Sequence, residues 1–95
     1  MILPESVRIG PYTFKVIQHD RLREDGNDCW GTIKYAEGVI NIETGHTDEH
    51  TRVTLLHEVL HGLDHAGAIG LREKQIRRLA PALMAFLQEN GWLKE

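Results

Sequence analysis

The chain has 95 residues, of which 41% are hydrophobic and 26% are charged, with 9 glycines and 3 prolines that follow no period. These values predict a single domain over residues 1–95 and exclude collagen-like and low-complexity chains, and the longest uncharged stretch, ten residues, is too short for a membrane span of about 20. Eleven Lys and Arg against fourteen Asp and Glu give a net charge of −3, which argues against a nucleic-acid partner.

The amino-terminal half contains short runs rich in β-branched and aromatic residues, which are typical of strands. Residues 7–9 and 12–17 flank a Gly-Pro turn and predict a first hairpin or a bent strand. The polar segment 21–28 predicts a loop. Residues 30–35 and 39–43 flank a short Gly-containing turn and predict a second hairpin.

From residue 47 onward the hydrophobic period becomes helical. Thr47 is a suitable N-cap, and Asp48 and Glu49 follow in the first turn, where the helix dipole favours acidic side chains. We expect this helix to run to about residue 66 and to end at Gly67. Its broad apolar face, suited to lie on a sheet, consists of Val53, Leu55, Leu56, Val59, Leu60 and Leu63.

A second helix is predicted from about Leu71, with apolar residues again at helical spacing. Pro81 lies inside this pattern, and because proline lacks a backbone donor it predicts a kink or a split in the helix. The fold class that results is α+β, with a small, mostly antiparallel sheet followed by two helices.

The string His57-Glu58-Val59-Leu60-His61 carries the clearest chemical signal in the chain. On a helix, His57 and His61 lie one turn apart on one face, so that both imidazoles can bind one ion. Glu58 points about 100° away, close enough to act on a metal-bound water without being a ligand. Two imidazoles and a carboxylate suit zinc, which keeps an open fourth position in catalytic sites.

Composition alone gives roughly a 3% chance of such a string. Glu58 is the only charged residue between Thr54 and Leu63, so the segment is expected to be buried. Buried imidazoles and a buried carboxylate without partners are costly, and a metal ion removes that cost. The alternative is a pair of core histidines with a solvated Glu58.

A third metal ligand has to come from outside this turn. His65 lies about 12 Å along the helix from His57, too far to share its ion. Gly67 occupies the position where the astacin-like and reprolysin-like motif places its third histidine, which excludes that subclass. Glu73, at the edge of the second helix's apolar stripe, is the better candidate. The alternative for Glu73 is an acidic residue placed in the first helical turn by the dipole.

These residues resemble the compact gluzincin metallopeptidases, and more narrowly the minigluzincin-like phage and prophage proteins related to the ImmA/IrrE group. The resemblance is carried by residues 57–61, by Glu73 after eleven intervening residues, and by the apolar positions Ile76, Leu79 and Ala80 that follow it. The opening residues 3–7 are also similar to the first hairpin of those proteins. The chain departs from them at Pro81, where they keep an uninterrupted helix.

The resemblance implies a zincin-like fold in which His57, His61 and Glu73 bind Zn²⁺ and Glu58 is the general base. We therefore expect a zinc-dependent metallopeptidase, latent or narrow in specificity because so small a domain offers only a shallow pocket. Its peptide or protein substrate is expected to lie extended along residues 39–43 as the edge strand. Tyr12, Tyr35 and His65 are equally available to stabilise the oxyanion, and the sequence does not rank them.

Other polar and aromatic residues carry weaker hypotheses. Asp64 is expected either to orient an imidazole ligand or to be solvated. His50 is expected at the surface or at the rim of a cleft, and His19 and His46 in loops. A buried Cys29 thiol beside a packed Trp30 indole is favoured over a fourth ligand. Trp92 in the tail either caps the core or places the terminal acid in the cleft as a latch.

Two further expectations concern function and compartment. The alternative function is a zinc-binding protein-interaction module that keeps the site without turnover, for which a fourth protein ligand would close the coordination shell. The single cysteine and an amino terminus without a basic or apolar leader favour a cytoplasmic location. Phage or prophage origin is implied by the resemblance alone.

Overall fold

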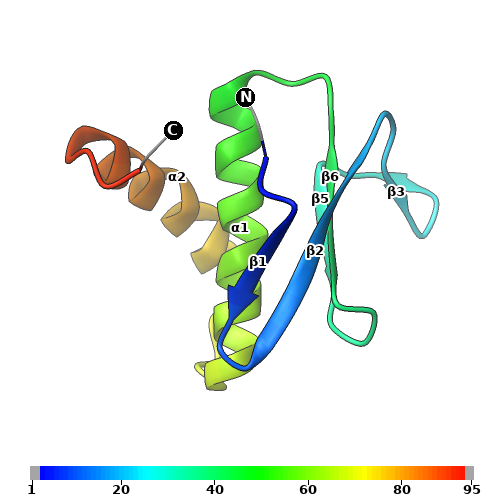
Figure 1. Cartoon of the computed structure of the whole chain (residues 1–95), viewed down its shortest axis with the longest axis horizontal. Coiled ribbons are helices and arrows are strands. Elements are labelled where there is room, and N and C mark those ends of the chain that lie inside the picture. The colour runs from blue at the N-terminus through cyan, green and yellow to red at the C-terminus, as the bar shows by residue number, and fades with distance from the viewer. Residues whose placement is uncertain (1–2, 94–95) are drawn as a thin grey trace.

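In the part of the chain that the structure describes, six strands precede two helices. The structure, a computed structural model, describes residues 3–93. The elements, in chain order, are β1 (Ser6–Ile9), β2 (Tyr12–His19), β3 (Arg23–Glu24), β4 (Asn27–Asp28), β5 (Gly31–Lys34), β6 (Val39–Glu43), α1 (Asp48–Gly67) and α2 (Glu73–Glu89). Figure 1 shows α1 in the middle, with the sheet on one side and α2 on the other. The predicted α+β class is confirmed.

The main sheet has four strands in the order β1-β2-β6-β5. The two predicted hairpins are present, since β1 pairs antiparallel with β2 and β5 pairs antiparallel with β6. β2 and β6 pair in parallel, which makes the sheet mostly rather than wholly antiparallel. The prediction that residues 39–43 form an edge was wrong, because β6 has a strand on each side. The two edge strands are β1 and β5, and β5 is the one that lies beside Glu58 of α1.

Segment 21–28 is not a plain loop, as was predicted, but a short two-stranded ribbon of β3 and β4. Its turn is made by Asp25 and Gly26, whose φ angles of 52° and 80° are the pair that a tight hairpin turn requires. The segment is fixed to the sheet at Leu22, which is buried and whose backbone N–H donates to the Glu43 carboxylate at 2.9 Å. This contact holds the chain in place just before β5.

The first core lies between the sheet and α1. It is built from buried residues of the strands, against which Leu55 and Val59 of α1 pack; these residues are Leu3, Ile9, Phe14, Ile40 and Ile42. Gly62 allows the helix to approach closely, because a Cβ there would lie 2.6 Å from Cδ1 of Ile9. A side chain at position 62 would therefore force the helix and the sheet apart.

The start of α1 follows the prediction, and its end differs by one residue. The hydroxyl of Thr47 caps the helix by accepting the backbone N–H of His50 at 3.2 Å. Gly67 is still helical, and it is Ala68 that takes the left-handed conformation, with φ 49° and ψ 46°. An L-residue with a Cβ is strained in that region, so the last turn of α1 is held by its surroundings.

A second, smaller core joins the two helices. Leu60 of α1 meets the buried Ile76 and Ala80 of α2. Pro81 lies inside α2, which nevertheless runs unbroken from Glu73 to Glu89, so the expected split does not occur. Pro81 and Arg77, four residues earlier, are both exposed, and solvent can replace the hydrogen bond that proline cannot donate.

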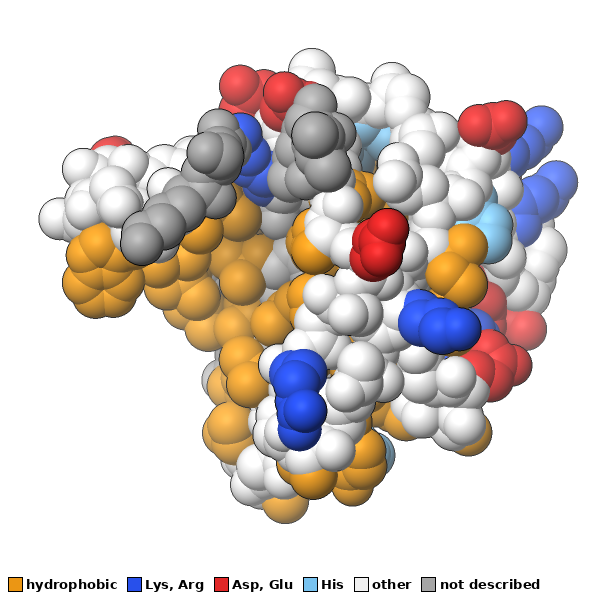
Figure 2. Space-filling view, in the orientation of Figure 1, with side chains coloured by type: hydrophobic (Ala, Val, Ile, Leu, Met, Phe, Trp, Pro, Cys, Tyr) orange, Lys and Arg blue, Asp and Glu red, His pale blue; other side chains and the backbone are white. Residues whose placement is uncertain are grey.

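The carboxyl-terminal half of α2 leaves apolar surface uncovered. Figure 2 shows hydrophobic side chains along this helix and in the hollow between it and the rest of the molecule. Trp92 is 66% exposed and packs edge-on against Phe86, with ring centroids 5.0 Å apart, so it does not cap the core. The latch predicted for the terminal acid lies outside the described residues. No helix within residues 3–93 has the length and hydropathy to cross a membrane.

Candidate metal centre

Three predicted ligands meet between α1 and the start of α2. His57 Nε2 lies 2.9 Å from Glu73 Oε1, and His61 Nε2 lies 2.5 Å from Glu73 Oε2. The two imidazole nitrogens are 3.2 Å apart. Among the described residues this is the group whose ligand atoms, all within 4.8 Å of one another, could hold a metal ion.

The spacing of these atoms fits a common ion. Tetrahedral zinc with bonds of 2.0–2.2 Å places its ligand atoms about 3.3 Å from one another. The separation of the two imidazole nitrogens, 3.2 Å, is close to that value, and the nearest Glu73 oxygens, Oε1 at 2.9 Å from His57 and Oε2 at 2.5 Å from His61, are closer than it. Two imidazoles and one carboxylate are also a donor set that zinc uses in catalytic sites. The residues present therefore fit the metal that the sequence predicted.

The position of Glu73 depends on the turn between the helices. Asp64 near the end of α1 accepts the backbone N–H groups of Gly70 and Leu71, each at 2.8 Å. Gln75 accepts the backbone N–H of Arg72 at 2.8 Å, which fixes the first turn of α2. The sequence predicted that Asp64 either orients an imidazole or is solvated, and the structure shows a third role. Asp64 ties down the turn that brings Glu73 to the histidines.

Glu73 is in the first helical turn, as its alternative reading required, and also within reach of both imidazoles. Its side chain is 49% exposed, and its only other ion pair among the described residues is with Arg77 at 3.7 Å. The dipole and the two histidines act on the same carboxylate. The two explanations for an acid at this position are therefore compatible.

Glu58 is buried beside the ligands and faces the edge strand. The residue is 7% exposed, and a Cβ on Gly31 would lie 3.3 Å from both its Cγ and its Oε2. Gly31 thus leaves the room that the carboxylate occupies. Burial, with a smaller contribution from the negative charge of Glu73, raises the pKa of Glu58 to about 7. Such a pKa suits a group that takes and returns a proton near neutral pH.

Burial also acts on His57, one of the candidate ligands. The pKa of His57 is lowered chiefly because the ring is desolvated, and the nearby Glu73 carboxylate opposes this only in part. A lowered pKa favours the neutral imidazole, which is the form that binds a metal. The position of His57 and the lowered pKa of its ring therefore both favour metal binding.

The three candidates for oxyanion stabilisation come together near the end of α1. The ring of Tyr35 stacks on that of His65, with centroids 4.0 Å apart and planes at 18°. The Tyr12 ring centroid lies 6.5 Å from that of His65. The Tyr35 hydroxyl donates to the backbone carbonyl of His61 at 3.2 Å, next to a ligand. Their catalytic role stays a prediction.

The structure corrects some of the weaker expectations and bears out others. Cys29 is half-buried, with its thiol 3.9 Å from the Leu22 carbonyl oxygen, and is not in the metal-binding group. Trp30 is 60% exposed rather than packed in the core. His19 ends β2 instead of lying in a loop, and its Nε2 contacts Oδ1 of Asn41 at 2.7 Å. His46 does precede α1 in a loop, where Glu43 pairs with it at 2.8 Å.

Two contacts along α1, one in the site and one outside it, had no signal in the sequence. The importance of Gly31 depends on β5 lying beside α1, and the contact of Trp30 with His50 joins residues twenty positions apart.

Comparisons of the chain with protein-family models, curated proteins and solved structures found no match. The arguments for function therefore rest on the geometry of this site.

Proposed function

We propose that this protein is a zinc-dependent metallopeptidase of zincin-like fold, with His57, His61 and Glu73 as the metal ligands and Glu58 as the general base. The observation that carries the proposal is the convergence of the three ligand atoms beside a buried carboxylate. The described residues supply three ligands in that group, and three protein ligands are typical of catalytic zinc.

The proposed chemistry divides between the metal and the chain. A bound zinc ion lowers the pKa of water toward about 7 and polarises a carbonyl group. Glu58 accepts the proton of the attacking water and donates it to the leaving amine as the peptide bond breaks. Its raised pKa lets one side chain do both near neutral pH. Burial of the carboxylate keeps bulk water from competing for that proton.

The substrate is proposed to lie along β5. This strand pairs with β6 on one side, and no other described strand pairs with it, so its other edge is free. An extended peptide binds such an edge through backbone hydrogen bonds. Gly31 at the start of β5 abuts Glu58, so a peptide on this edge passes close to the general base. This edge replaces the predicted one at β6.

The proposal is tested by replacing Glu58 with Gln. We expect E58Q to keep its zinc and to lose about 10²- to 10⁴-fold in hydrolysis of a mixed fluorogenic peptide library. The matched control is E49Q, which changes an exposed acid in the first turn of α1 and should hydrolyse the library as wild type does. Hydrolysis by E58Q at the wild-type rate would refute the mechanism.

The same experiment separates the alternative function. A wild-type protein that binds zinc and cleaves no peptide in the library would favour the interaction module. That outcome would leave the ligand set standing and remove the general-base role of Glu58.

A further inference from the structure

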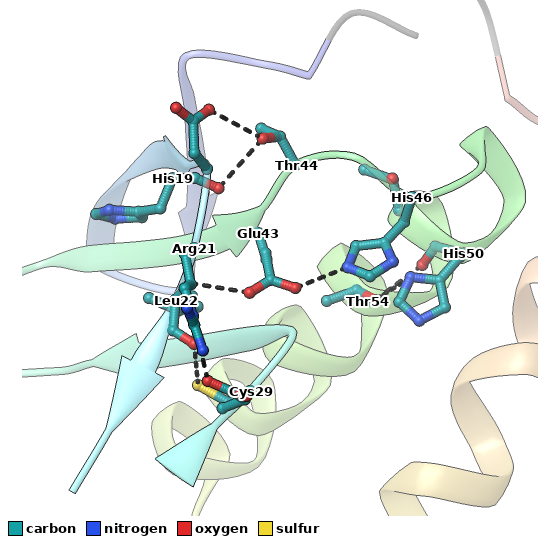
Figure 3. A network of polar contacts seen from close by, with 12 residues as sticks. His19, Arg21, Leu22, Cys29, Glu43, Thr44, His46, His50 and Thr54 are labelled. Carbon is teal, nitrogen blue, oxygen red and sulfur yellow. Dashed lines mark hydrogen bonds and ion pairs between the residues drawn. The ribbon is translucent and has the colours of Figure 1, made fainter. Parts of the chain in front are cut away.

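Three rings form a cluster at the amino-terminal end of α1, outside the metal centre. The Trp30 ring packs edge-on against His50 with centroids 4.5 Å apart, and His50 lies 4.4 Å from His46. Figure 3 shows His46 and His50 side by side, with Glu43 pointing toward His46. We call Trp30, His46 and His50 the ring cluster. Nothing in the proposed mechanism uses it.

The ring cluster stands on the same helical face as the metal ligands. His50 and His57 are seven residues apart, which is close to two full turns and about 10 Å along the axis. From His50 to the midpoint of the two histidine ligands the rise is about 13 Å. His50, the member of the cluster that belongs to α1, therefore lies on the same stripe of the helix as His57 and His61, and Trp30 and His46 pack against it from outside the helix.

The edge strand connects the two places. Trp30 immediately precedes β5 and lies beside His50. One residue on, Gly31 lies beside Glu58. Further along, Ile33 packs near Gly62. β5 thus runs alongside α1, with the ring cluster at its start and the metal centre further along. A peptide on the free edge would reach both.

We propose that the ring cluster is a side-chain subsite for an aromatic or large aliphatic residue of the bound peptide. The inference rests on the proposed function, because it places the peptide on the β5 edge. An indole that is 60% exposed offers a large apolar surface, and aromatic rings pack favourably with apolar and aromatic partners. The pairing of His46 with Glu43 holds one wall of the cluster in place.

The geometry also sets the position of that residue. An extended peptide advances about 3.3 Å per residue. A span of about 13 Å therefore places the recognised side chain three or four residues from the bond held at the metal centre. The specificity of the site is thus predicted to depend on a residue distant from the cleaved bond.

The test uses zinc-loaded E58Q as a binding host that does not turn over. The probes are blocked peptides of about ten residues, in which Phe, Leu, Lys or Ala is placed at each position in turn, with affinity measured by fluorescence polarisation. We expect Phe or Leu at one position to bind about tenfold more tightly than Ala there. In E58Q/W30A this ratio should fall to near one. The matched control is E58Q/W92A, which removes an equally exposed indole far along the chain and should keep the ratio.

Retention of the preference in E58Q/W30F, which keeps a ring, would support the subsite even if W30A folds poorly. The inference is overturned if no peptide shows a positional preference, if W30A weakens Phe and Ala peptides equally, or if Lys is preferred. Self-association that is lost in W30A, without any peptide preference, would assign the cluster to a second copy and also overturn it. A clear preference in E58Q with no cleavage by wild type would instead count against the proposed function alone.

Discussion

Glu58 is the residue at which the requirements of chemistry and of folding conflict. Its carboxyl is buried beside Gly31, and its pKa is raised to about 7. A group whose pKa is higher in the folded chain stabilises the fold when it is protonated. That contribution is complete below the unfolded value of about 4.5 and is lost as the pH rises through about 7. The ionised carboxylate therefore destabilises the metal-free protein at alkaline pH.

We predict that E58Q, measured in chelator, is more stable than wild type by on the order of 3 kcal/mol at pH 8. The gain should shrink steadily as the pH is lowered toward 4.5. Urea unfolding at several pH values measures it. E49Q is the control, because its carboxylate is exposed at the helix start. A difference between E58Q and wild type that does not change with pH would contradict the account of Glu58.

At the level of the elements, the end of α1 contains a residue in an unfavourable conformation. Ala68 has a φ of 49°, a region that glycine adopts without penalty. We predict that A68G raises the free energy of unfolding by about 0.5–1 kcal/mol. A66G, two residues earlier in the helix, should lower it by about the same amount. Thermal unfolding of the two variants decides the matter, and equal destabilisation by both would show that the strain at Ala68 is absent.

The elements could largely be predicted because their signals are local. Thr47 and the acids after it determine where α1 begins, and a Gly-containing turn determines the hairpin that ends in β6. The order of strands was not predictable in this way. β6 inserts beside β2 through parallel pairing of Lys15 with Val39, residues that are far apart in the chain. A pattern of alternating residues does not distinguish a central strand from an edge.

In the candidate site, too, the features set by local sequence could be predicted and those set by long-range contacts could not. His57 and His61 are one turn apart on one helix, so their spacing alone brought them together. Glu73 was predicted as the third ligand by elimination and by its place on the second helix. In the structure its carboxylate lies within reach of both imidazole rings. Trp30 was expected to be buried because a tryptophan beside a strand usually is. Trp30 is exposed because the chain bends just before β5. No pattern in the sequence predicted that bend.

At the level of the whole molecule, the candidate metal centre lies between α1 and the first turn of α2, beside the smaller core that these two helices share. α2 is anchored to α1 by Ile76 and Ala80, while its distal half leaves apolar surface open, as Figure 2 shows. An ion held by His57, His61 and Glu73 would link the first turn of α2 to α1. Binding that occurs only in the folded state stabilises it in proportion to the logarithm of ligand concentration.

We predict that removing zinc increases amide hydrogen exchange mainly in α2, while the amides of β2 and β6 change little. The physical reason is that the three candidate ligands lie on α1 and α2, whereas none of them lies on the sheet. E73Q should show rapid exchange in α2 with or without zinc. Uniform loss of protection across the sheet and both helices would mean that the metal contributes to the fold in a different way.

The central claim is that Glu73 completes a zinc site with the two histidines. Its most direct test is the zinc content and zinc affinity of wild type, E73Q and the control E49Q, each titrated against a chelator. We expect one zinc per chain in wild type and E49Q, with affinity at least about tenfold weaker in E73Q. Wild type that binds no zinc after supplementation, or E73Q that binds it as tightly as wild type, would contradict the account.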